Sequence, residues 1–320
     1  MRTDVRLTQE LKSLILSGGI DMVGVAAVDR WDHTPPGYYS PRYYMPEART
    51  VISLVRHIPE GTIEVWGERD EPGRTIGPYL HYGYGMANFD MAHVIHRATK
   101  RLEQLGHKAM AHAVATCSHY RSNGEPVPYW TTRPDWSQPH AAVAAGLGEF
   151  GWLGIFISTR FGTHVRLGSI VTSAPLVVDP MYAGPALCQP DACGYKCVRA
   201  CPVNAFSSTD TTTIQIGDRV FHKARHDNIK CEAAVSGITR GSGARSDVVF
   251  PAEVIDKAEV ARRNLEVHWA DREIRGQTFA IIGGNYCGRC LHVCPAPVGA
   301  RHRRMAIVAD AGEPASEEPR

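Results

Sequence analysis

The sequence predicts a mixed α/β (α+β) fold in two parts, an α/β domain over residues 1–180 and a cysteine-rich domain over residues 181–310. Helix-like and strand-like segments alternate through the first part, whereas eight of the nine cysteines lie beyond residue 187. A chain of 320 residues that is 43% apolar is long enough for about two domains with a substantial core. The Pro- and Glu-rich residues 311–320 are expected to form a disordered tail.

Apolar residues at helical spacing predict helices, and short β-branched runs between Gly or Pro residues predict strands. The last two strands are expected to pair with each other around Gly162. Two stretches rich in Pro and polar residues are expected to be loops. The expected helices cover residues 7–18, 89–105, 139–145 and 254–270, the strands 22–28, 50–55, 108–115, 155–158 and 165–172, and the loops 30–46 and 118–139.

The cysteines have the pattern of ligands to two iron–sulfur clusters. A [4Fe–4S] cluster takes four thiolates, and in two-cluster ferredoxins the Cys that precedes Pro ligates the other cluster. Cys201 and Cys294 each precede a Pro. The sequence therefore predicts two interleaved quartets, and Cys117 is left over as a small apolar residue. One quartet comprises Cys188, Cys193, Cys197 and Cys294, and the other Cys201, Cys231, Cys287 and Cys290.

The spacing of the first cysteine run departs from the bacterial pattern. The run from Cys188 to Cys201 has gaps of four, three and three residues, wider than the usual two, two and three. Either one of these cysteines is then idle or one cluster is unusual. Zinc also binds paired cysteines, but two Cys-Pro endings and an interleaved octet favour iron–sulfur clusters. An odd number of cysteines and no secretory signal argue against disulfides.

Charge and hydropathy exclude some classes of protein. A net charge of +2 argues against a dedicated DNA-binding protein. No apolar run approaches the roughly 20 residues that span a bilayer. We therefore expect a cytoplasmic protein without a membrane span, in a compartment where thiols stay reduced.

Residues 146–151 match the dinucleotide-binding pattern G-x-G-x-x-G, but their context differs from it. A Rossmann fingerprint follows a strand and has an acidic residue about 20 positions further on. Here the preceding stretch is Ala-rich and is expected to be helical, and residues 166–171 contain no acid. NAD or FAD binding at these glycines is therefore not expected.

The same glycine-rich stretch carries a family resemblance. Residues 144–151, 165–168 and 171–176, together with the cysteine octet, resemble the cobalamin-dependent reductive dehalogenases and, less closely, the epoxyqueuosine reductases of tRNA modification. The resemblance covers most of residues 15–297. It implies a nitroreductase-like cobalamin-binding domain, a ferredoxin-like domain with two [4Fe–4S] clusters, and a corrinoid held between them.

The resemblance also implies roles for particular residues. Gly146, Gly148 and Gly151 are cofactor-binding candidates, because a residue without a Cβ lets the backbone approach a corrin closely. The alternative is that these glycines only serve turns. In reductive dehalogenases a Tyr with a nearby cation supplies a proton. Of Tyr79, Tyr82 and Tyr84, which precede the 89–105 helix, the family position falls at Tyr82 or Tyr84.

Arg166 lies where the family has an Arg, and is expected to partner that tyrosine; each of these residues is otherwise a packing or surface residue. The epoxyqueuosine reductases use an Asp that falls near Thr132 here, with Asp135 three residues away. The missing acid, together with Glu149 and Arg166, favours the dehalogenase side. Tyr129, Trp130, Trp136 and Trp152 are expected either to line an aromatic pocket or to belong to the core.

The sequence thus predicts a corrinoid iron–sulfur reductase that removes a halide or an oxygen substituent from a small organic molecule. Its partners would be the substrate and an external electron donor, such as a ferredoxin, a flavodoxin or a reductase. The alternatives are an epoxide reductase acting on tRNA and a ferredoxin-like electron carrier without catalysis. A first domain of about 180 residues exceeds what an electron carrier needs.

Overall fold

The protein is described from a computed structural model, which describes residues 3–33, 40–67, 78–112, 136–235 and 287–296. At its centre is an antiparallel four-stranded sheet in the order β1-β2-β6-β3. The mixed α/β class predicted from the sequence is confirmed, and the antiparallel pairing makes the sheet of the α+β kind. The strands are β1 Met22–Ala27, β2 Thr50–His57, β3 Ala109–His112 and β6 Val165–Thr172.

Strand alternation gives the sheet two apolar faces, because successive side chains point to opposite sides. Ile52 and Ile170 face one layer, and their neighbours Val51 and Val171 face the other. All four side chains are almost completely buried. The sheet is therefore a middle layer that is covered on both sides.

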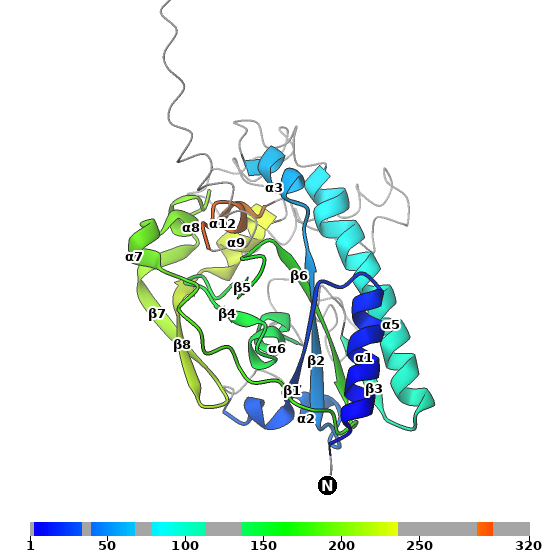
Figure 1. The fold of residues 1–320 in the computed structure, drawn as a ribbon. Coiled ribbons are helices and arrows are strands. Elements are labelled where there is room, and N and C mark those ends of the chain that lie inside the picture. The colour runs from blue at the N-terminus through cyan, green and yellow to red at the C-terminus, as the bar shows by residue number, and fades with distance from the viewer. Residues whose placement is uncertain (1–2, 34–39, 68–77, 113–135, 236–286, 297–320) are drawn as a thin grey trace, which may run out of the picture.

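Two helices, α1 Val5–Ser17 and α5 Ala87–Gln104, cover one face of the sheet (Figure 1). Asp4 caps α1, because its carboxylate accepts a hydrogen bond of 2.8 Å from the N–H of Leu7. The buried residues of α5 recur every three or four positions, so that one stripe of the helix faces the strands. This layer contains no cysteine and forms an apolar core of its own.

The other face is covered by helix α6 Gln138–Ala144 and by two antiparallel strand pairs (Figure 1). Ile214, Ile216 and Phe221 of the second pair belong to the same apolar cluster as α6 and the sheet. This pair is thus part of the central core, although it lies beyond residue 180 in the sequence. The pairs are β4 Gly148–Phe150 with β5 Phe156–Ser158, and β7 Phe206–Ile216 with β8 Arg219–His226.

The cysteine-bearing segments gather at one end of this second layer, where Figure 1 shows α7, α8, α9 and α12 together. Helix α12 packs against α8 and against α3, and so joins segments that are about 90 to 230 residues apart in sequence. The helices here are short: α7 Pro190–Cys193, α8 Lys196–Arg199, α9 Asn228–Val235 and α12 Arg289–His292. The remaining elements are η1 Val28–Trp31, α2 Pro41–Tyr44, α3 Glu60–Gly67 and η2 Tyr79–Met86, the last a π-helix that runs into α5.

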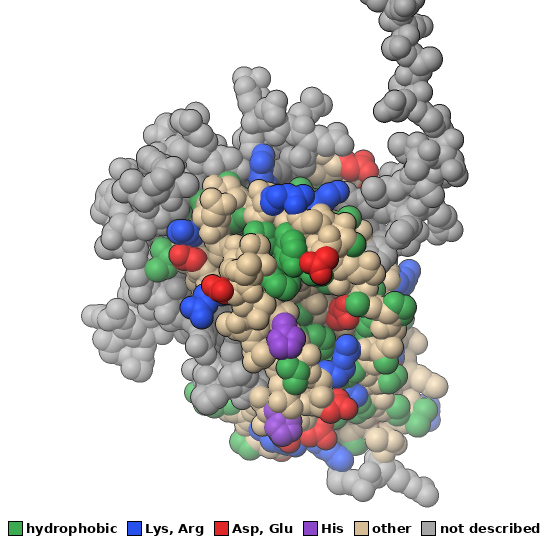
Figure 2. All heavy atoms as spheres, turned by 90° about the vertical axis from the view of Figure 1, so that its left-hand side faces the viewer, with side chains coloured by type: hydrophobic (Ala, Val, Ile, Leu, Met, Phe, Trp, Pro, Cys, Tyr) green, Lys and Arg blue, Asp and Glu red, His purple; other side chains and the backbone are tan. Residues whose placement is uncertain are grey.

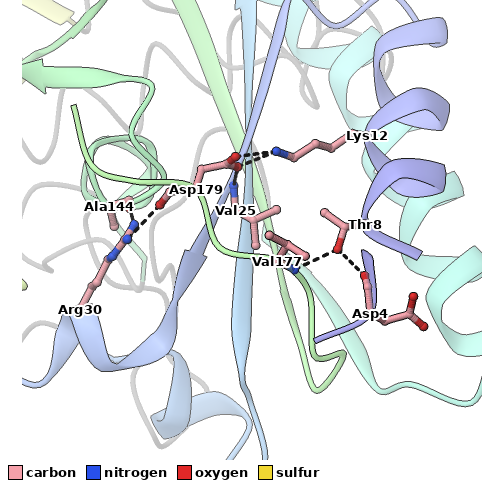
Figure 3. A network of polar contacts seen from close by, with 8 residues as sticks. All are labelled: Asp4, Thr8, Lys12, Val25, Arg30, Ala144, Val177 and Asp179. Carbon is pink, nitrogen blue, oxygen red and sulfur yellow. Dashed lines mark hydrogen bonds and ion pairs between the residues drawn. The ribbon is translucent and has the colours of Figure 1, made fainter. Parts of the chain in front are cut away.

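A polar network fixes the segment that leads from the sheet to the cysteines (Figure 3). The carboxylate of Asp179 accepts hydrogen bonds of 2.7 Å from Lys12 Nζ and from the N–H of Val25. Its carbonyl oxygen accepts a bond of 2.9 Å from Arg30, which also donates to the carbonyl of Ala144. The segment at the boundary expected near residue 180 is therefore held against the sheet by hydrogen bonds of Asp179. The division into two domains at this point stays a prediction.

The predicted helices at 7–18, 89–105 and 139–145 and all five predicted strands are present, with ends that differ by a few residues. The predicted pairing of residues 155–158 with 165–172 is wrong. Strand β6 already pairs with β2 on one edge and with β3 on the other, so it has no free edge for β5, which pairs with β4. Only an isolated bridge joins Ser158 to Gly162.

Two further differences concern local signals. The predicted loop at 30–46 contains the short helix α2, and the β7–β8 hairpin has no counterpart among the predicted strands. The predicted helix at 254–270 and residues 118–135 of the second predicted loop lie outside the described residues. None of the helices in the described part of the chain has the length and the apolar character that a membrane crossing requires.

Candidate functional site: two cysteine quartets

The first quartet surrounds a cavity of about 500 Å³ at the end of the molecule that carries α7 and α8. Cys188, Cys193 and Cys197 come from the first cysteine run, and Cys294 follows α12. On this face, which Figure 2 shows, hydrophobic side chains gather in the upper half beside several Lys and Arg side chains. The cavity walls are mainly apolar, and comprise the four cysteines with Trp152, Leu187, Gln189, Pro190, Ala192, Lys196, Pro295 and Ala296.

A tight turn between α7 and α8 allows the widely spaced cysteines to share this cavity. Gly194 and Tyr195 both have left-handed backbone conformations, with φ of 60° and 55°. A left-handed Tyr is unusual, since only Gly, Asn and Asp adopt this region readily. The hydroxyl of Tyr195 donates a hydrogen bond of 2.9 Å to Asp191, which closes the turn. The extra residues of the run therefore form a turn that returns Cys197 to the cavity.

The second quartet lies beside the first. The electrostatic neighbours of Cys290 are Cys287, Cys231 and Cys201, and the next is Cys197 of the first quartet. Cys201, Cys231 and Cys287 pack against a small apolar cluster formed by Val203, Ala205 and Ala234. Segments that are remote in sequence thus bring four sulfurs together, at a short distance from the other four.

Four of the thiols, two in each quartet, are in an environment that opposes a bare thiolate. Burial raises the pKa of Cys188 and that of Cys197 to about 11, and it also raises the pKa of Cys287 and Cys290. A cationic metal centre offsets this cost, because metal-bound thiols are deprotonated. Backbone N–H groups also point at sulfur: Trp152 donates to Cys188 Sγ at 3.2 Å. Hydrogen bonds of this kind are a feature of iron–sulfur sites.

Among the described residues, no group of three or more His, Cys, Asp or Glu is positioned to hold one metal ion. The four cysteines of the first quartet surround a cavity, and four thiolates are the donor set of one [4Fe–4S] cluster. The donor set therefore fits two iron–sulfur clusters. The quartets assemble as the Cys-Pro rule groups them, and their role as cluster ligands stays a prediction.

The glycine-rich block is packed against the protein itself. Gly146 has φ of +76°, and a Cβ there would lie 2.0 Å from the carbonyl oxygen of Pro180. A Cβ on Gly148 would lie 2.0 Å from the carbonyl oxygen of Ile157, and a Cβ on Gly151 would lie 2.8 Å from the side chain of Ile157. Intrachain packing thus accounts for the three glycines, and cofactor binding at them stays a prediction. Helix α6 precedes the block, as expected, so it is no Rossmann fingerprint.

Two of the three predicted catalytic residues are in contact. The guanidinium of Arg166 lies 4.0 Å from the centre of the Tyr84 ring, in a cation–π arrangement, and its Nε donates a hydrogen bond of 2.7 Å to Asn88. Tyr84 is 9% exposed. Tyr82 is 67% exposed and lies on the other side of the π-helix turn. Of the two candidates, the structure brings Tyr84 to Arg166.

Tyr79 is a buried neighbour of the second quartet that the choice between Tyr82 and Tyr84 passed over. It stacks edge-on against His292 of α12 at 4.8 Å between ring centres, and it adjoins Gly288 in the cysteine loop. Burial raises its pKa, whereas the nearby Arg166 lowers it. A π-helix begins at Tyr79, and π-helical turns are frequent at functional sites. The amino-acid sequence alone does not reveal a π-helix, so this signal appears only in the structure.

Of the residues expected to line an aromatic pocket, the two that the structure describes, Trp136 and Trp152, lie in different places. Trp136 is a core residue that stacks on His112 and donates a hydrogen bond of 2.7 Å to Ser169. Trp152 instead lines the first cysteine cavity. Cys117, Thr132 and Asp135 lie outside the described residues.

The fold and the paired quartets define a mixed α/β protein with two adjacent groups of four cysteines. No family model matches the chain. Tetrachloroethene reductive dehalogenase from Desulfitobacterium hafniense is 29% identical over 226 aligned residues, covering 59% of this chain and 36% of that protein. The sequence resemblance to the reductive dehalogenases is thus confirmed, and the chain spans only about a third of the length of this relative.

Solved structures resemble the chain more distantly. A reductive dehalogenase described in terms of B12-dependent dehalogenation has a TM-score of 0.48 and 18% identity, covering 87% of this chain and 37% of that one. An epoxyqueuosine reductase from Streptococcus thermophilus has a TM-score of 0.47 and 16% identity, covering 96% of this chain and 86% of that one.

Proposed function

We propose that this protein is a corrinoid-dependent iron–sulfur reductase that removes a halide, or an oxygen substituent, from a small organic molecule. The observation that carries the proposal is the assembly of eight cysteines into two adjacent quartets. The similarity to tetrachloroethene reductive dehalogenase supports the reaction class. A small-molecule substrate and an external electron donor belong to the same proposal.

The eight cysteines would hold two clusters, and bound clusters would supply low-potential electrons. The reduction potential of such a cluster depends on its net charge, its solvent exposure and the hydrogen bonds to its sulfurs. Trp152 and Ala205 donate backbone N–H groups to Cys188 and Cys201 at 3.2 and 3.3 Å. The proximity of Cys290 to Cys197 supports electron transfer between the quartets.

Cobalamin enters the proposal through the family resemblance. The described residues do not outline a cradle for a corrin, because Pro180 and Ile157 already occupy the space beside the glycines. No chemical step is therefore derived from the corrinoid. When bound, such a group supplies a strongly nucleophilic and reducing metal centre, and the protein supplies position and proton.

Tyr84 is the proposed proton donor and Arg166 its partner. A cation over the ring stabilises the electron-rich phenolate that remains once the proton has left. Asn88 holds the guanidinium in place. We expect Tyr84→Phe to lower turnover by about 10²–10⁴-fold, the usual contribution of a general acid, with iron content unchanged. Tyr82→Phe is the matched control, and equal losses in the two variants would remove the assignment.

Anaerobic reconstitution tests the proposal as a whole. The protein is loaded with iron, sulfide and hydroxocobalamin, and its absorbance and EPR spectra are recorded. We expect iron and sulfide for two clusters and a cob(II)alamin signal of a bound, base-off corrinoid. Clusters without corrinoid uptake would indicate an electron carrier, and zinc in place of iron would overturn the proposal. Assays with haloaromatic compounds and with epoxyqueuosine would then separate dehalogenation from epoxide reduction.

A further inference from the structure

The glycine-rich block contains one acidic residue, Glu149, whose carboxylate reaches the first cysteine quartet. Glu149 is the middle residue of β4 and is 7% exposed. Its Oε1 accepts hydrogen bonds from the N–H of Leu187 and, at 3.2 Å, from the N–H of Cys188. A carboxylate of the β4–β5 strand pair thus fixes the backbone where the cysteine run begins.

The strand that carries Glu149 is itself tightly held. Glu149 pairs with Ile157 of β5, and Gly148 and Gly151 leave no room for a Cβ against that residue. The position of the carboxylate is therefore set by the backbone of β4. Without it, two amide donors at a partly buried site would lose their acceptor, which is unfavourable because a buried N–H needs a hydrogen-bond partner.

The same segment also holds the sulfur of Cys188. The N–H of Trp152, three residues after Glu149, donates to Cys188 Sγ at 3.2 Å. The carbonyl of Trp152 accepts a bond of 2.7 Å from Ala224 of β8, and its indole donates to Ser207 at 3.1 Å. Residues 149–152 thus make two hydrogen bonds to Cys188, one to its backbone N–H and one to its sulfur.

The charge of Glu149 has a consequence separate from these hydrogen bonds. Reduction adds an electron to a cluster, and a nearby negative charge in a poorly solvated site opposes that addition. Lys196, on the cavity wall, acts in the opposite direction. A carboxylate bonded to the backbone of one ligand therefore acts on the first cluster more strongly than on the second.

We propose that Glu149 is a positioning residue for Cys188 and that its charge lowers the reduction potential of the first cluster relative to the second. The inference rests on the proposed function only in requiring that both quartets hold iron–sulfur clusters. It assigns to the glycine-rich block a role in coupling the β4–β5 strand pair to the first cluster.

Substitutions at Glu149 separate reach from charge. Glu149→Gln keeps the reach and an acceptor oxygen but removes the charge, whereas Glu149→Asp keeps the charge and shortens the reach. The full chain is reconstituted anaerobically with iron and sulfide, its iron and sulfide are measured, and its clusters are titrated by EPR. Glu103→Gln, an exposed residue of α5 on the opposite face of the sheet, is the control for a change of charge.

We expect Glu149→Gln to shift the midpoint of the first cluster to a less negative value, with a tenfold or larger change in its reduction equilibrium, about 59 mV for one electron. The second cluster serves as an internal reference and stays unchanged. We expect Glu149→Asp to lose iron from the first cluster, and Glu103→Gln to match the wild type. Loss of the first cluster alone in Glu149→Gln would also support the positioning role.

Two clusters with wild-type potentials in both Glu149 variants would overturn the inference and leave the proposed function intact. A wild-type protein that takes up no iron would overturn the proposed function itself, before any variant is compared.

Discussion

The sheet region and the cysteine quartets are stabilised in different ways. The sheet is held by backbone ladders and by two apolar layers whose residues are almost all fully buried. Within the described residues, the apolar cluster at the second quartet consists of three small buried residues, Val203, Ala205 and Ala234. Around the quartets the helices are one or two turns long, and thiols occupy positions that apolar side chains fill elsewhere.

The difference indicates which region depends on a cofactor. Short helices are marginal in water without tertiary support, and buried thiols need a metal to be stable as thiolates. The sheet requires neither. We therefore expect the quartets to fold around their clusters on a sheet that is already stable, with Asp179 and Glu149 as the attachment points.

Metal removal is the most severe test of this comparison. Stripping iron with a chelator under oxidising conditions should abolish amide-exchange protection in α7, α8 and α12, because the clusters contribute folding free energy there. The sheet strands should keep their protection. Hydrogen–deuterium exchange with mass spectrometry measures both regions in one sample. A uniform loss over the whole chain would show that the two regions form one cooperative unit.

Truncating the sheet core should have the next largest effect. Ile170 lies in the central strand β6 with no exposed surface, so Ile170→Ala should destabilise the protein by about 2–5 kcal/mol through lost burial and a cavity. Denaturant unfolding of the cluster-loaded protein measures this change. Iron content at low denaturant should stay at the wild-type level, and a parallel loss of iron would contradict the independence of the regions.

Acid should weaken the sheet side through its buried histidines. Burial lowers the pKa of His140 to about 3 and that of His112 to about 4. A histidine in the unfolded chain has a pKa near 6.5, so as the pH falls the unfolded chain takes up protons before the folded protein does. The free energy of unfolding is therefore at its full value above pH 6.5 and decreases as the pH drops toward the folded pKa values. At pH 5, His140 alone should cost about 2 kcal/mol, at about 1.4 kcal/mol per pH unit. His140→Gln should flatten the stability profile between pH 7 and 5, whereas an unchanged slope would exclude this residue as the cause.

Weakening the contacts of Asp179 should have the smallest effect on stability. Asp179→Asn removes the charge that Lys12 pairs with, in a bridge about one-third exposed at each end, so about 1 kcal/mol is expected. The amide oxygen can still accept from the N–H of Val25. Thermal unfolding and exchange rates in β1 measure the change. Asp32→Asn, which breaks the more exposed bridge to Arg42, is the matched control and should be close to neutral.

Much of the local structure follows from the sequence. Helical spacing in 89–105 and β-branched runs at 50–55 and 165–172 identify α5, β2 and β6, because amphipathic periodicity reflects the layer each element joins. The hairpin β7–β8 has a turn signal at Gly217 and Asp218, but most residues 206–213 of its first strand are polar and at least partly exposed, so apolar alternation is weak. Strand pairing is harder to predict from the sequence, because it depends on which strand edges remain free. The sequence predicts that residues 155–158 pair with β6, whose two edges are taken by β2 and β3.

The site divides in the same way. The Cys-Pro endings at Cys201 and Cys294 place eight sulfurs into two groups from spacing alone, and the structure assembles the same groups. The glycines of 146–151 could not be assigned from the sequence, because a missing Cβ serves a ligand and a neighbouring backbone equally well. Their close approach to Pro180 and Ile157 is visible only once the chain has folded.

The amino-acid sequence alone determined the kinds of element and the cysteine grouping, since both are local patterns with fixed spacing. The tertiary structure alone decided that Tyr84 rather than Tyr82 meets Arg166, that Tyr79 adjoins the second quartet, and that Glu149 reaches Cys188. These contacts join residues up to about 200 positions apart. Their formation depends on how the layers pack, and no pattern within a single segment encodes that packing.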